Sequence, residues 1–261
     1  MSISYRTAST QTSYLQYSAT LGMMFLATEA NRKEIDRIKA SFGDDWKRGF
    51  TGLSKETVSG QARAELQSLG IHPATVGGHI IDVHTFKNTN GASDSEYLRV
   101  VLDGDDGSKI NLSLDLSSNV AQQLIRKLAN VSSSEFVQIY LFANLNQKGY
   151  AEHWVSVFAG PNADNLQKVH GIDPRVDLVP AIDTALAAVS NVKDKKVLRA
   201  VREATVNEFH VKLLTESVIP AFTNARENDL PDSKDLDDQS PSVDHPDPNA
   251  STLASTKEAL A

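Results

Sequence analysis

The sequence predicts an α+β protein whose centre is a five-stranded antiparallel sheet. A two-residue hydrophobic period runs through 97–102 and 109–116, a helix-period segment follows at once, and two further alternating runs come next. Helical patterns lie before and after this block. With 261 residues, 40% of them hydrophobic, the chain is long enough to bury a sizeable core.

The N-terminal part is expected to be a helical extension over 1–76. Residues 1–28 are rich in Ser, Thr and Tyr and have no clear period, whereas 29–42 place apolar residues at helical spacing. A second helix is expected from Ser54, a good N-cap residue, to about Leu69, because a glycine and a proline follow.

The strands begin with HIIDVHTF (79–86), and a hairpin around DGDDGS joins 97–102 to 109–116. Residues 109–116 alternate strictly, as a half-buried antiparallel strand requires. One face is apolar, with Ile110, Leu112, Leu114 and Leu116, and the other is polar, with Lys109, Asn111, Ser113 and Asp115.

A single helix, capped by Ser117 or Ser118, separates this hairpin from strands at 136–143 and 152–159. Five strands with one helix between the third and fourth is the order of an OB-fold barrel, which we predict over 77–162. A five-stranded α+β sheet with other pairings stays open, since sequence fixes strand order but not pairing.

The C-terminal part divides into helices and an acidic tail. Residues 163–226 predict two helices that pack on the core or on a partner. Residues 227–261, the acidic tail, hold nine acids and two bases, so they carry the whole net charge of −7. Rich in Asp, Pro and Ser and without aromatic residues, this tail is expected to be disordered.

Several function classes are disfavoured. The chain has no cysteine, which excludes thiolate chemistry and fits a reducing compartment. It has no P-loop, dinucleotide-binding or zinc-protease motif, and DGDDG lacks the calcium-loop spacing. We therefore expect no catalytic residue, no metal and no cofactor. Without a signal peptide or a span of bilayer length, the protein is expected in the cytoplasm.

The succession EYLRVVLDGDDGSKINLSLDLSSNVAQQLIRKLANVSSSEFVQIYLFA resembles the OB domain of bacteriophage single-stranded DNA-binding proteins. The likeness covers about 77–160, and the acidic C-terminus also resembles theirs. It implies a protein that coats and protects single strands in DNA replication, recombination or repair, and whose acidic tail contacts replication or recombination proteins. If a phage encodes the chain, the cytoplasm in which it is expected is that of the host.

Binding of single strands without sequence preference needs cations beside the phosphates and aromatic faces for the bases. Such residues lie on the polar faces of the hairpin strands, at the end of the first strand and in the 144–152 loop. We expect nine of them to contact DNA, or RNA: Phe86, Lys87, Tyr97, Arg99, Lys109, Asn111, Lys148, Tyr150 and Trp154.

Two alternatives stay open. The tail acids, among them Asp235, Asp237 and Asp238, are expected either to bind partner proteins or to compete with DNA for a basic groove. The chain is alternatively a non-enzymatic protein-binding module for virion or replisome assembly, with the helices of 175–219 as surfaces for a homo-oligomer or a partner.

Overall fold

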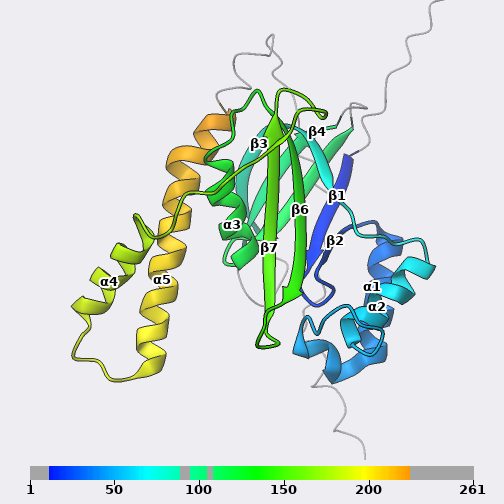
Figure 1. Cartoon of the computed structure of the whole chain (residues 1–261), viewed down its shortest axis with the longest axis horizontal. Coiled ribbons are helices and arrows are strands. Elements are labelled where there is room, and N and C mark those ends of the chain that lie inside the picture. Colours follow the sequence, from blue (N-terminus) through cyan, green and yellow to red (C-terminus); the bar gives the residue numbers. More distant parts are fainter. Residues whose placement is uncertain (1–11, 89–94, 105–107, 224–261) are drawn as a thin grey trace, which may run out of the picture.

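The structure, a computed structural model, describes residues 12–88, 95–104 and 108–223 of the chain. One mixed sheet forms the centre, with α1 and α2 on one side and α3, α5 and α4 on the other (Figure 1). The helices are α1 (Glu29–Phe42), α2 (Val58–Ser68), α3 (Asn119–Leu128), α4 (Leu178–Ala188) and α5 (Lys195–Leu213), with a 3-10 turn η1 (Gly43–Arg48) and a π turn η2 (Leu214–Val218).

The sheet has eight strands in the order β2-β1-β5-β4-β3-β6-β7-β8. A further pairing of Met23 with Phe142 brings β2 against β6. The strands are β1 (Thr12–Ser18), β2 (Met23–Leu26), β3 (Val76–Asn88), β4 (Ser95–Asp103), β5 (Lys109–Asp115), β6 (Phe136–Leu145), β7 (Ala151–Gly160) and β8 (Gln167–Lys168).

The expected five-stranded antiparallel OB-fold barrel is therefore wrong. The sheet has eight strands, and it is mixed because β1 runs parallel to β5. Both β1 and β2 come from 1–28, where no strand was expected. Of the β1 side chains only Leu15 is buried, so this polar strand lacks the hydrophobic alternation by which strands are found.

The two hairpins within 95–160 are confirmed. β4 pairs with β5 and β6 pairs with β7, both antiparallel. α3 lies between them in sequence, and the Ser118 hydroxyl caps it by accepting from the Ala121 amide at 3.2 Å. For α2 the expected cap is displaced by one turn, since Thr57 rather than Ser54 caps the helix.

The main core lies on the inner side of the sheet. Buried residues of β3 to β7 pack there against α3 and against the end of the C-terminal helix. Its fully buried members include Leu98, Val100, Leu112, Leu124 and Phe222. At about 25 cal/mol per Å2 of buried apolar surface, this cluster supplies the main driving force for folding.

A second core lies between the outer side of β1 and β2 and the helices α1 and α2. It contains Met23, Phe25, Ile38, Trp46 and Leu66, all buried. α1 and α2 cover the outer face of β1 and β2. The outer face of β3, β4 and β5 is not part of this second core.

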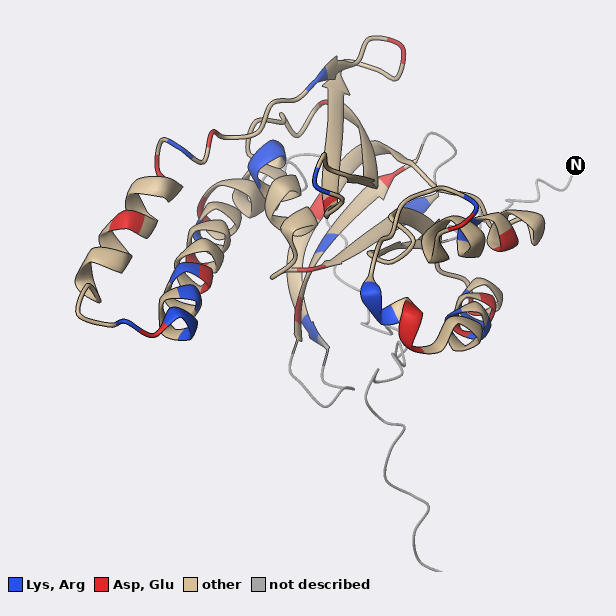
Figure 2. Cartoon of the chain, turned by 60° about the horizontal axis from the view of Figure 1, so that its bottom comes forward, with Lys and Arg blue, Asp and Glu red and all other residues tan. Residues whose placement is uncertain are grey.

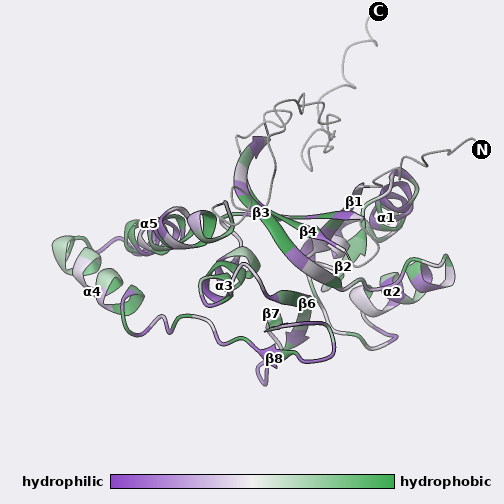
Figure 3. Ribbon diagram, turned by 90° about the horizontal axis from the view of Figure 1, so that it is seen from above, coloured by the Kyte–Doolittle hydropathy of each residue, from purple (hydrophilic) through white to green (hydrophobic). Residues whose placement is uncertain are grey.

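The C-terminal helices form a hairpin in which α4 is the outermost element (Figures 1 and 3). α5 packs on α3, where the Gln122 amide donates to Asn207 Oδ1 at 3.0 Å. None of the helices in the described ranges combines the length and the apolar character that a membrane span needs.

Candidate functional site

Alternate residues of β3, β4 and β5 lie on the outer face of the sheet, away from the main core. Pairing of β3 with β4 places Phe86 beside Tyr97. Arg99, two positions further along β4, pairs with Ser113 of β5. Since residues paired in register point to the same side, these side chains share one face.

Phe86, Tyr97 and Arg99 make direct contact, and we call them the Arg99 cluster. The Phe86 and Tyr97 rings stack with centroids 5.4 Å apart and planes inclined by 21°. The guanidinium carbon of Arg99 lies 4.0 Å from the Phe86 ring centroid, and Arg99 Nε donates to Ser113 Oγ at 3.3 Å. All three side chains of the cluster are half-buried, so part of each reaches the surface.

Among the described residues, no carboxylate neutralises the charge of Arg99. None of the ion pairs within the described ranges involves Arg99. Burial lowers the pKa of its guanidinium, and the neighbouring Tyr14 acts in the opposite sense. Burial also raises the pKa of Tyr97, with a further contribution from Asp115. The cluster therefore offers one cation and two aromatic rings to a ligand.

Lys109 and Asn111 share the face of the Arg99 cluster, but β1 changes their surroundings. β1 runs beside β5 and pairs Thr12 with Lys109 and Tyr14 with Asn111. Asn111 is consequently only 9% exposed, while Lys109 is half-buried at the end of the strand. A strand next to β5 was not expected, so the sequence could not indicate that Asn111 is covered.

Lys87 belongs to the other side of β3. It follows Phe86 directly and pairs with Glu96. Successive side chains of a strand point to opposite faces, so Lys87 does not join the Arg99 cluster.

Lys148, Tyr150 and Trp154 form a second group, on β7 and in the turn before it. Trp154 pairs with Phe142 of β6, whereas the pairing of β3 with β6 runs from Val76 to His79 and does not include Phe86. No strand pairing between described residues joins this group directly to the Arg99 cluster.

In this second group Tyr150 is 68% exposed and Trp154 is 44% exposed. Lys148 and Tyr150 belong to a tight turn in which their backbone amides donate to Asn146 Oδ1 at 2.9 and 3.0 Å. Trp154 lines a cleft between β7, α3 and the segment 168–174. Arg126, Lys127 and Lys168, which line it as well, were not anticipated, because no motif links the distant segments.

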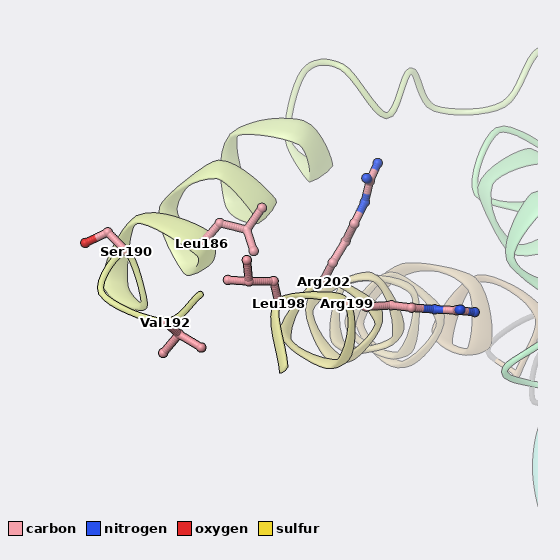
Figure 4. A pocket seen from close by; sticks show the side chains of 6 residues that line it. All are labelled: Leu186, Ser190, Val192, Leu198, Arg199 and Arg202. Atoms are coloured by element: carbon pink, nitrogen blue, oxygen red, sulfur yellow. The ribbon is translucent and has the colours of Figure 1, made fainter. Parts of the chain in front are cut away.

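A smaller groove, with a volume of about 430 Å3, lies between α4 and α5. Leu186, Val192 and Leu198 line it, with Arg199 and Arg202 at its edge (Figure 4). Lys and Arg residues gather at this end of α5 (Figure 2). Exposed Val176, Val179, Val197 and Val211 add to the apolar surface of the C-terminal helices.

The described residues contain no group of three or more histidines and carboxylates placed to hold a metal ion. The tail residues Asp235, Asp237 and Asp238 lie outside the described ranges. Comparison of the chain with protein-family models, with curated proteins and with solved structures gives no match.

Proposed function

We propose that the protein binds single-stranded nucleic acid, DNA or RNA, largely without sequence preference, through the Arg99 cluster. The observation that carries this proposal is the stacked Phe86–Tyr97 pair with the Arg99 guanidinium, which forms no ion pair within the described residues, over the Phe86 ring. Aromatic rings stack on any base, and a cation beside them attracts the phosphates. We further propose that the protein coats strands in replication, recombination or repair in the cytoplasm, and that the acidic tail assists.

The charges near the cluster set how such binding should respond to salt. Arg99 and Lys109 are two cations that the described parts of β4 and β5 place on this face. Each neutralised phosphate of a single strand contributes about −0.7 to the slope of log affinity against log salt. We expect a shallow slope, between about −0.7 and −1.4, with most of the affinity supplied by stacking.

The test is fluorescence anisotropy of a labelled oligo(dT) of about 30 nucleotides, titrated with the full chain at several salt concentrations. Phe86→Ala should weaken binding about 5- to 150-fold, which corresponds to the loss of about 1–3 kcal/mol of stacking. The matched control is Tyr140→Ala, since Tyr140 forms a T-shaped pair with Phe158 at 5.8 Å in β6 and β7. Absence of binding, or equal losses in both variants, would refute the proposal.

A second candidate function rests on the C-terminal helices. Of the eleven residues of α4, LVPAIDTALAA, only Leu178 and Ile182 are buried. Such an apolar, poorly covered helix is typical of a protein-binding surface. The occupant we propose is a second copy of this chain. A Val179→Asp variant should then sediment as a smaller species than the wild type, whereas a monomeric wild type excludes self-association.

A further inference from the structure

The cleft beside Trp154 is bounded by three elements that are far apart in sequence. β7 forms one wall, α3 another, and the segment 168–174 a third, around a volume of about 830 Å3. Binding pockets for small molecules have about 300–1,000 Å3, so this cleft is large enough for one.

The third wall is fixed to the C-terminal end of α3. The Ile172 amide donates to the Arg126 carbonyl at 3.0 Å, and Asn130 Nδ2 donates to the His170 carbonyl at 2.7 Å. At Gly171 a Cβ atom would lie 3.3 Å from Arg126 Cβ, so the backbone approaches the helix closely. The cleft is thus a built feature of the fold.

Three cations line the cleft, and one of them, Lys127, donates through Nζ to the Val169 carbonyl at 3.3 Å. Arg126 and Lys127 come from the last turn of α3, and Lys168 from β8. None of the ion pairs in the described part of the chain includes any of them. Arg126 Nε is buried and has no hydrogen-bond partner. Burial lowers the pKa of Lys127, and the like charges of Lys168 and Arg126 lower it further.

The two acids in the cleft make other contacts. Asp173 Oδ1 accepts from the amide and from Nε of Arg175 at 2.9 and 3.2 Å. Glu152 Oε1 accepts from Asn146 Nδ2 at 2.9 Å. Neither acid forms an ion pair with Arg126, Lys127 or Lys168, but burial lowers the pKa of Arg126 and the charge of Asp173 raises it in part, so Asp173 offsets some of the positive charge.

The position of two of the cations has an ordinary explanation. Arg126 and Lys127 sit at the C-terminal end of α3, where positive charge is favoured by the helix dipole. This does not account for Lys168, which lies on β8, or for the exposed indole of Trp154 in the same cleft. The combination of like charges and an exposed ring indicates a ligand.

The backbone on both sides of Trp154 is held by hydrogen bonds. Gln123 Nε2 of α3 donates to the His153 carbonyl at 2.7 Å, and Gln123 Oε1 accepts from the Val155 amide at 3.2 Å. Both residues that flank Trp154 are thus fixed to α3. A fixed backbone at this position reduces the conformational entropy that is lost when a ligand stacks on the ring.

We propose that this cleft binds a nucleotide with a terminal phosphate, the base stacking on Trp154 and the phosphate contacting Arg126, Lys127 and Lys168. Three cations that take part in no ion pair within the described residues suit a phosphate monoester, which carries close to two negative charges, and an exposed indole suits a base. The nucleotide is either free or the 5′-phosphorylated end of a strand. This site is separate from the Arg99 cluster and does not rest on the function proposed for it.

The test uses the fluorescence of Trp154. The chain has two tryptophans, and Trp46 is buried, so a Trp46→Phe variant reports on Trp154 alone. AMP should quench its emission saturably, whereas adenosine, which lacks the phosphate, should bind at least about tenfold more weakly. If Trp46→Phe does not fold by circular dichroism, the wild type serves, with Trp46 as a constant background.

A second arm identifies the source of the nucleotide. Oligo(dT) with a 5′-phosphate is compared with the same strand bearing a 5′-hydroxyl. Tighter binding of the phosphorylated strand than of AMP and of the hydroxyl strand assigns the cleft to strand ends, while a preference for AMP assigns it to free nucleotides.

Variants complete the test. Lys168→Gln should weaken AMP binding about tenfold, since one charge-assisted contact is lost. Lys39→Gln, on the exposed side of α1, should leave it unchanged. Absence of saturable quenching by both AMP and the phosphorylated strand, or equal affinities of the two variants, overturns the proposal. Phe86→Ala should leave the AMP signal intact, so the two proposals fail separately.

Discussion

Replacing Gln123 with alanine should destabilise the fold by about 2–4 kcal/mol. The side chain of Gln123 is 8% exposed and joins α3 to the backbone of β7 through two hydrogen bonds. Water in the neighbouring cleft can replace the bond to the His153 carbonyl, at a net cost of about 1 kcal/mol. The bond to the Val155 amide is buried, and leaving that donor unsatisfied costs about 1–3 kcal/mol more.

Urea unfolding followed by circular dichroism measures this loss. With an m-value of about 3 kcal/mol per molar, the midpoint should fall by roughly 1 M at unchanged slope. Gln61→Ala is the matched control, because Gln61 lies on the exposed side of α2, where such changes cost less than about 0.5 kcal/mol. A midpoint for Gln123→Ala equal to that of the control would refute the view that Gln123 holds β7 in place.

Two further outcomes are expected. Burial lowers the pKa of His153 and of His210 below the ordinary value of about 6.5, so the unfolded chain binds more protons and stability should fall as the pH drops below about 6.5. His153→Gln should flatten this dependence, and a pH-independent wild-type urea midpoint between pH of about 7.5 and 5 would contradict it. Gly22→Ala should cost at least about 2 kcal/mol more than Gly149→Ala in the same assay. Both glycines have positive φ, but only at Gly22 would a Cβ meet the Phe50 ring at 2.7 Å, and equal costs would rule out this steric cause.

Sequence alone predicts those elements whose hydrophobic period is strong. The helix expected at 29–42 is α1, with the same bounds, and the alternation of 109–116 places Leu112 and Leu114 in the core. β2 has four residues and β8 two, too few to display a period. These short strands, together with the polar β1, are the ones that change the fold class.

The residues of the candidate sites also fall into two groups, those that a local sequence pattern places and those that only the folded chain brings together. Strand alternation alone puts Tyr97 and Arg99 on one face, and Phe86 joins them through the pairing of β3 with β4. Burial of Asn111 depends on β1, which lies about a hundred positions earlier in the chain. The Trp154 cleft combines residues from three segments whose proximity only the folded chain creates, so no local pattern could reveal Lys168 as part of it.

The parallel pairing of β1 with β5 also determines when β1 can pair during synthesis of the chain. Thr12 leaves the ribosome long before its partner Lys109, and at about 5–20 residues per second the delay is on the order of 5–20 s. Through this interval β1 has no β5 beside it, and nascent chains arrested before residue 109 should be cleaved by protease within 12–18, whereas the complete chain should resist. The polar side chains of β1, which give this strand no hydrophobic alternation, would also keep it from aggregating while it is unpaired.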